Sequence, residues 1–188
     1  MKIDKFIIFK YIILIIAVIT TLTPFIWMFL TSFKNPAEVA SVNVLPERWD
    51  LENYYKIFEY IPFTQYYLNS LIISIVQTLG TIIIASMAAY AFSCIKFYGS
   101  STIFFLYLTT IMIPGWVTLI PTFKIIQNLG LLNTYTALII VGLNNVMGVF
   151  LIRQFFSTIP KVYFDAAFID GANHFKIFLN IVIPLAKP

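Results

Sequence analysis

The sequence carries little charge for its length. Asp, Glu, Lys and Arg together make up 11% of the 188 residues, whereas a soluble domain carries about 25%. Hydrophobic residues account for 60% of the chain, and the formal net charge is +4. This composition excludes an ordinary soluble domain and predicts an all-α polytopic membrane protein, with residues 1–188 forming one transmembrane domain.

Cysteine and histidine are almost absent. The single cysteine, Cys94, excludes a disulfide framework within the chain, and the single histidine, His174, leaves no metal-binding cluster. We interpret Cys94 as a small buried residue and His174 as a surface residue. The sequence contains no G-x-x-x-x-G-K-[ST] loop for ATP phosphates and no acid–base or Ser/His/Asp set. It therefore predicts no catalytic residue, no metal and no cofactor in this chain.

Long uncharged runs define the membrane topology. A helix of about 20 residues crosses the hydrocarbon core, and four segments meet this requirement: about 11–33, 70–92, 102–120 and 135–152. The first run is longer than the apolar region of a signal peptide and ends in bulky residues, so we expect it to be retained. The polar stretch 34–66 between the first two runs is predicted to be an extracytoplasmic loop.

Basic residues favour a cytoplasmic N-terminus. With that orientation eight Lys and Arg residues lie inside and four lie outside, as the positive-inside rule requires. The inside set is Lys2, Lys5, Lys10, Lys96, Arg153, Lys161, Lys176 and Lys187, and the outside set is Lys34, Arg48, Lys56 and Lys124. Four spans then return residues 161–188 to the cytoplasm.

Small and helix-breaking residues mark the spans. Thr81, Ala85, Ala89 and Ser93 recur every four residues, which predicts close helix packing rather than transport chemistry. Pro114-Gly115 and Pro121 are expected to break the third span near its far end, and Arg153 is expected to stop the fourth.

Two asparagines lie near the middle of the fourth span. Asn144 and Asn145 should face the interior of the bundle. They could touch a solute or hydrogen-bond another helix, and we favour the second interpretation.

The last segment, 161–188, differs from the spans. It predicts a short helix over 161–170, a left-handed cap at Gly171 and a second helix that begins after Asn173 and ends at Pro184. Lys161 and Asp165 share a face of the first helix, and Ala166 and Ala167 would form a smooth patch that another surface can approach. The second helix has a polar stripe on an otherwise apolar surface, typical of a helix lying along a membrane or under a bundle.

These residues resemble the "EAA" loop of permease subunits from binding-protein-dependent ABC importers. The matching positions are Asp165-Ala166-Ala167, Asp170-Gly171-Ala172, Phe175, Ile181, Pro184-Leu185 and Pro188, with Asp165 in place of the usual Glu. The resemblance implies a type I ABC importer permease fold whose loop is a cytoplasmic coupling helix inserted into a cleft of a separate ATPase subunit. The implied ATPase-coupling residues are Asp165, Ala166, Ala167, Asp170, Gly171 and Pro184. An ordinary interfacial hairpin is the alternative.

Further motifs resemble the carbohydrate-uptake branch, the maltose-type second permease. They are Thr31-Ser32-Phe33-Lys34, Trp49-x-Leu51-x-Asn53-Tyr54, Leu68-Asn69-Ser70-Leu71, Gly130-Leu131-Leu132-Asn133-Thr134 and Arg153-Gln154-Phe155-Phe156. The implied partners are an ABC ATPase dimer that binds ATP, a second permease subunit, an extracytoplasmic solute-binding protein and the bilayer of a bacterial inner membrane. One position departs from this branch: Trp116, two residues after Pro114, stands where a polar residue is expected.

Family members have about two further spans after this loop, so the resemblance implies four spans of an expected six in a C-terminally truncated sequence.

Three other functions stay open: a permease for a non-sugar solute, a channel or secondary carrier whose loop only resembles the motif, and a membrane scaffold. The predicted spans lack Asp, Glu, Lys, Arg and His. Because proton-coupled carriers usually place ionisable groups there, this absence favours an external energy source.

Overall fold

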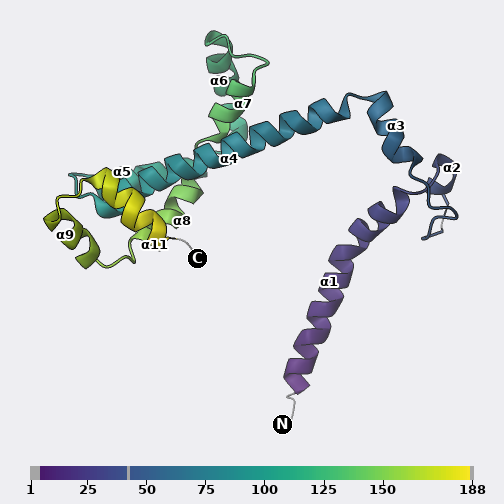
Figure 1. Cartoon of the computed structure of the whole chain (residues 1–188), viewed down its shortest axis with the longest axis horizontal. Coiled ribbons are helices and arrows are strands. Elements are labelled where there is room, and N and C mark those ends of the chain that lie inside the picture. Colours follow the sequence, from purple (N-terminus) through teal and green to yellow (C-terminus); the bar gives the residue numbers. More distant parts are fainter. Residues whose placement is uncertain (1–4, 42, 187–188) are drawn as a thin grey trace. The chain divides into compact units, whose positions relative to one another are not determined.

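The computed structural model describes residues 5–41 and 43–186, and this part of the chain consists of helices and loops without a strand. The predicted all-α class is therefore confirmed. The chain divides into two compact units, residues 1–68 and 69–188, which are considered separately (Figure 1). Lys2, Lys187 and Pro188, which the topology and motif predictions include, lie outside the described residues.

The first unit begins with the long helix α1 (Lys5–Thr31), of which Phe6–Thr31 is apolar enough to cross a membrane. Its 27 residues reach about 40 Å at about 1.5 Å per residue, more than the hydrocarbon core requires. The helix stays continuous through Pro24. In the middle of the helix, the hydroxyl groups of Thr20, Thr21 and Thr23 each donate to the carbonyl four residues back at 2.8 Å, so these three present no unpaired donor to lipid.

The polar loop that follows is folded around two sequence motifs. It contains the short helices α2 (Pro36–Val39) and α3 (Glu52–Tyr60). The Asn53 side-chain amide donates to the carbonyls of Ser32 at 3.0 Å and Lys34 at 2.8 Å. The Phe33 ring lies 5.1 Å from Trp49, centroid to centroid. The Thr31–Lys34 and Trp49–Tyr54 motifs, separate in sequence, thus form one cluster.

Lys34 is the buried cation of this cluster. It is 1% exposed, its amine lies 4.9 Å from the centre of the Trp27 ring, and it donates to the Asn43 carbonyl. At the exposed surface of α3, Lys56 pairs with Glu52 at 2.7 Å. This hydrogen bond and the glutamate charge raise the pKa of Lys56.

The second unit comprises most of α4 (Phe63–Cys94) and all later elements (Figure 1). These are α5 (Ser100–Thr109), η1 (Thr110–Met112), α6 (Gly115–Asn128), α7 (Tyr135–Gly142), α8 (Val146–Phe156), α9 (Val162–Ile169), α10 (His174–Ile177), the π-helical segment η2 (Phe178–Val182) and α11 (Ile183–Leu185). Helix α4 begins at Phe63, seven residues before the predicted span at residue 70, so its first turn lies within the stretch assigned to the loop 34–66.

The remaining predicted spans are bent helix pairs. Residues 100–112 and 115–128 meet at 100°, and residues 135–142 and 146–156 meet at 46°. The expected break at Pro114 is confirmed, because this residue separates η1 from α6. The prediction was wrong for Pro121, which lies inside α6. Helix α8 continues past Arg153 to Phe156, and the end of the fourth span at Arg153 stays a prediction. Counting each pair as one span gives four candidate spans.

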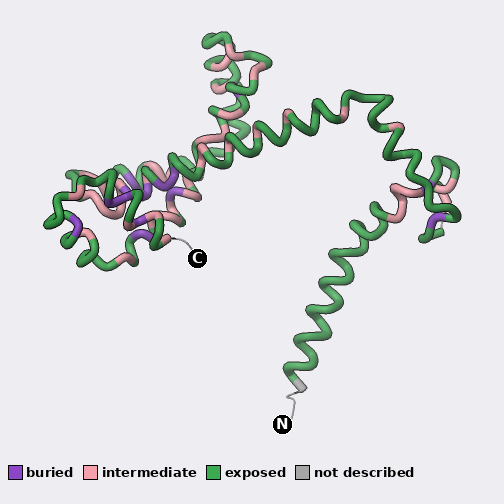
Figure 2. The backbone as a smooth tube through the Cα atoms, viewed as in Figure 1, coloured by how far each residue is buried: buried purple, intermediate pink, exposed green. Residues whose placement is uncertain are grey.

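The small residues of α4 serve helix packing, as predicted. Ala85 and Ala89 are 3% and 0% exposed, and the Thr81 hydroxyl donates to the Gly142 carbonyl at 3.2 Å. A methyl group added at Gly142 would overlap the Gln77 side chain, so α7 approaches α4 closely. Figure 2 shows most of the buried residues of this unit gathered where α4, α5, α8 and the α10–η2 segment meet. The core is Ala85, Ala89, Tyr90, Phe104, Val149, Phe156, Ala167, Ile177, Phe178 and Val182.

Arg153 ties three helices of this unit together. Its Nε donates to the Phe92 carbonyl in the last turns of α4 at 3.2 Å, and its guanidinium lies 4.1 Å from the centre of the Phe104 ring on α5. A cation near the C-terminus of α4 also complements the partial negative charge of that helix end.

We expect Arg153→Lys to lower the stability of the second unit by about 1–2 kcal/mol, because an ammonium keeps the charge but loses the planar stacking and the Nε–H donor. Thermal unfolding in detergent measures the loss. Lys124→Ala, at an exposed position of α6, is the matched control and should leave the unfolding midpoint unchanged. A wild-type midpoint for Arg153→Lys would show that charge alone suffices.

Candidate functional site

The candidate site is the α9–α11 hairpin, defined as residues 161–186. Gly171 forms its turn with φ at +77°, in the left-handed region. The Ala172 N–H donates to the Ala167 carbonyl at 2.9 Å, and the Gly171 N–H donates to the Phe168 carbonyl at 3.1 Å. These two bonds form a Schellman motif, which ends α9 and satisfies its last carbonyls. The predicted left-handed cap is confirmed.

The second arm of the hairpin starts at the predicted cap. The Asn173 Oδ1 accepts a hydrogen bond from the Lys176 N–H at 2.9 Å, and the helix then continues through α10, η2 and α11 to Leu185. The helix thus ends one residue beyond the predicted end at Pro184. A proline has no N–H and its ring crowds the carbonyl four residues back. The wider π-helical turn just before Pro184 accommodates both effects.

One face of this second arm holds the hairpin on the rest of the unit. Ile177 and Val182 are fully buried, and Phe178 is 8% exposed. The polar stripe of Asn173, Lys176 and Asn180 is exposed. The sequence predicted that this helix lies either along a membrane or under a bundle. In the structure its apolar face packs under the helical core.

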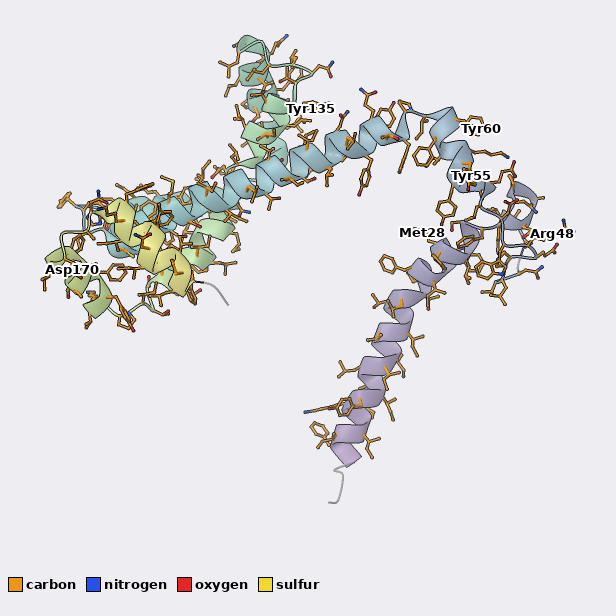
Figure 3. All side chains as sticks on the ribbon, viewed as in Figure 1. Met28, Arg48, Tyr55, Tyr60, Tyr135 and Asp170 are labelled. Carbon is orange, nitrogen blue, oxygen red and sulfur yellow. The ribbon has the colours of Figure 1, made fainter. Side chains whose placement is uncertain are left out.

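Helix α9 presents a mostly exposed surface. Asp165, Ala166 and Asp170 are exposed, and Asp170 lies at the end of α9 (Figure 3). Ala167 is 7% exposed and packs into the core. The expected smooth patch of Ala166 and Ala167 is therefore divided, because adjacent residues of a helix point about 100° apart. Ala167 anchors α9, and Ala166 faces outward.

The two carboxylates of α9 are free for other contacts. Within the described residues the ion pair is Lys56–Glu52, so Lys161 and Asp165 share a face without an ion pair at 4 Å. Beside them lies a cavity of about 520 Å³. Its walls include Lys96, Lys161, Asp165, Phe168 and His174.

His174 has a role that the sequence prediction missed. It is exposed, as expected, but its Nδ1 lies 3.0 Å from the hydroxyl of Tyr90 on α4. Its ring also packs edge-on against Phe168 of α9, with centroids 5.1 Å apart. The sequence offered one signal for this role, a lone histidine directly after a helix-capping residue. It could not identify the partner, because 84 residues separate His174 from Tyr90.

Asn144 and Asn145 lie at the break between α7 and α8, away from the hairpin in sequence. The Asn144 Oδ1 accepts a hydrogen bond from the Tyr107 hydroxyl at 2.9 Å, which links it to α5. The Asn145 Oδ1 accepts from the Gly148 N–H at 2.7 Å and caps α8. Asn144 therefore makes the contact with another helix that we favoured, whereas Asn145 makes a hydrogen bond within its own helix. Contact with a solute stays a prediction.

Three comparisons place these features among known proteins. Residues 70–188 match the family described as "Binding-protein-dependent transport system inner membrane component". The Escherichia coli (strain K12) "Inner membrane ABC transporter permease protein YcjP" is 38% identical over 174 residues, which cover 89% of this chain and 62% of that protein. The Bacillus subtilis (strain 168) "Galactooligosaccharides transport system permease protein GanQ" is 30% identical over 195 residues, covering 100% of this chain and 69% of that protein.

A solved structure has the same fold. It is a chain from the crystal structure of a bacterial ABC transporter involved in the import of the acidic polysaccharide alginate. The TM-score is 0.86 at 29% sequence identity, and the match covers 97% of this chain and 65% of that chain. The chain thus spans about two thirds of the length of the proteins it matches.

Proposed function

Because the chain belongs to the family of inner-membrane components of binding-protein-dependent transport systems, we propose that it is the permease subunit of an ATP-driven importer. The α9–α11 hairpin is its coupling element, and α9 inserts into a cleft of a separate ATPase subunit. The observation that carries this proposal is the hairpin itself. A rigid Schellman turn at Gly171 presents two exposed, unpaired carboxylates, while Ala167 and Ile177 fix the hairpin to the helical core.

ATP is bound and hydrolysed on the partner in this proposal. The permease contributes charge-assisted contacts from Asp165 and Asp170, whose carboxylates accept hydrogen bonds from basic groups at the ATPase cleft. The exposed apolar side chains of α9, such as Ile169 at 86% exposure, supply contact area around them. Closure of an ATPase dimer would then move α9, and the core contacts would pass that motion to the spans.

The proposed orientation places the hairpin and the N-terminus in the cytoplasm of a bacterial cell. In this proposal the loop that holds the cluster of Phe33, Trp49 and Asn53 is extracytoplasmic, and a solute-binding protein would dock there. A second permease subunit completes the pathway. The surfaces of α1 and α4 are apolar and exposed, which fits helices that face lipid or such a partner.

We propose sugars as the solutes. The support is the name of GanQ, a galactooligosaccharide permease protein, and the alginate transporter that shares the fold. The contact between the Thr31–Lys34 and Trp49–Tyr54 motifs adds to it, since both resemble the carbohydrate-uptake branch. A non-sugar solute stays the alternative within the same family. The family match disfavours a channel or secondary carrier.

Co-purification tests the coupling proposal. The full-length protein is expressed with its genomic neighbours, and the ATPase subunit that accompanies it is quantified. We expect reversing both charges in Asp165→Lys/Asp170→Lys to reduce the bound ATPase by about 10-fold or more, since each lost charge-assisted bond contributes about 1.5–3 kcal/mol. The matched control is Glu59→Lys on α3, which should bind as wild type does. An ATPase that never binds, or that binds equally to all three proteins, would contradict the proposal.

A further inference from the structure

Tyr90 places a hydroxyl group in the packed interior of the second unit. The residue is 5% exposed and belongs to the core. A buried tyrosine hydroxyl needs a hydrogen-bond partner. Here the partner is the Nδ1 of His174, 3.0 Å away, at the first residue of α10. A phenylalanine would fill the same space, so packing alone does not require the hydroxyl.

His174 in turn joins α9 to α4 through ring contacts. Its ring meets Phe168 of α9 at 5.1 Å in an edge-to-face arrangement, and its centroid lies 6.1 Å from that of Tyr90. Tyr90 also packs against Phe178 of η2 at 5.4 Å. The side chains Phe168, His174 and Tyr90 therefore form a continuous series from α9 to α4.

The surroundings of α9 make this series mechanically important. Among the eight residues of α9, Ala167 is the buried one. The cavity of about 520 Å³ is lined by side chains of α9, by the end of α4 and by the end of α8, so part of α9 does not pack tightly on those helices. Side chains that do not fill the space between two helices transmit little displacement between them. His174 lies on the wall of this cavity, and its directional hydrogen bond to Tyr90 connects that wall to α4 and the core.

We propose that Tyr90 and His174 form a positioning pair that makes α4 follow α9 when the ATPase moves it. The inference rests on the proposed function and goes beyond it, because it assigns the transmission step to two residues outside the coupling motif. The pair touches neither ATP nor solute. Its hydrogen bond keeps α9 and α4 in one arrangement, and without that bond α9 moves while α4 stays behind.

Distance measurements by electron paramagnetic resonance test this in the full-length complex with its ATPase, with Mg²⁺-ATP as the ligand. Spin labels are attached at Val162→Cys on α9 and Leu79→Cys on α4, both exposed positions, with Cys94→Ser removing the native thiol. We expect wild type to keep one distance population with and without nucleotide. Tyr90→Phe and His174→Ala should increase a second, detached population by about fivefold on ATP binding, since a net hydrogen bond changes a population by about that factor.

Two matched variants make the outcome decisive. His174→Asn, whose amide lies near the Nδ1 position, should return the detached population toward wild type. Tyr135→Phe removes a hydroxyl bonded to Asn69 at 2.6 Å in the same unit and should behave as wild type. If the ATPase still binds and the detached population of Tyr90→Phe is the same as that of wild type, the inference is overturned. Failure of the ATPase to bind the wild-type complex would instead overturn the proposed function, and this inference with it.

Discussion

Replacing Gly171 by valine should abolish productive recruitment of the ATPase while leaving membrane insertion intact. The φ of +77° at this residue lies in the region that L side chains avoid, and a β-branched residue is the least tolerant of it. The strain is about 2–3 kcal/mol. Relief of this strain breaks the two Schellman hydrogen bonds and redirects α9, so both exposed carboxylates lose their placement.

Two matched variants separate backbone strain from lost space. No atom lies within 4 Å of a methyl group added at Gly171, so size alone should be harmless. Gly171→Asn should therefore retain the ATPase, because asparagine tolerates the left-handed conformation. Gly130→Val imposes similar strain at φ +68° with equally open surroundings, but on a turn remote from α9 in sequence, and should leave recruitment unchanged. Normal ATPase binding by Gly171→Val would show that the turn geometry is dispensable.

The second large effect is expected at Ile177. This residue is fully buried where the second arm of the hairpin meets the core. Ile177→Ala removes three carbon atoms and leaves a cavity, which costs about 2–5 kcal/mol. Because the same face holds Phe178 and Val182, a loss of this size should loosen the whole arm and, with it, α9.

Thermal unfolding in detergent and ATPase co-purification measure the two consequences. The matched variant Leu179→Ala truncates a side chain of the same arm that is 46% exposed, so it should change the stability by about 0.5 kcal/mol or less. Similar unfolding midpoints for Ile177→Ala and Leu179→Ala would contradict the packing of this arm. A destabilised Ile177→Ala variant that still binds the ATPase normally would show that α9 is positioned independently of it.

The hydrogen bonds that cap the hairpin could be predicted from sequence, but which of its side chains are buried could not. Gly171 and Asn173 act on their own backbone neighbours, within about five residues, and such effects depend on local dihedral angles and side-chain type. Ala166 and Ala167 have identical side chains. Only the position of the core decides that Ala167 is buried and Ala166 is exposed.

The helix breaks show the same division. Pro114 interrupts its helix because its ring and missing N–H act locally, yet Pro121 is accommodated inside α6. The break between α7 and α8 carries no proline. It occurs where Gly142 approaches Gln77 and Thr81 of α4 and where Asn145 can cap the next helix. These α4 partners lie about 60 residues away in sequence, beyond the reach of any local pattern.

The sequence by itself determined the all-α class, the approximate spans, the left-handed turn and the asparagine cap of the hairpin, because hydrophobic length and backbone preference belong to short segments. The tertiary structure decided which face of each helix is buried, that the Thr31–Lys34 and Trp49–Tyr54 motifs form one cluster, and that His174 meets Tyr90. Such contacts form between residues far apart in the chain. Their free energy comes from packing and hydrogen bonds that exist only after the helices assemble.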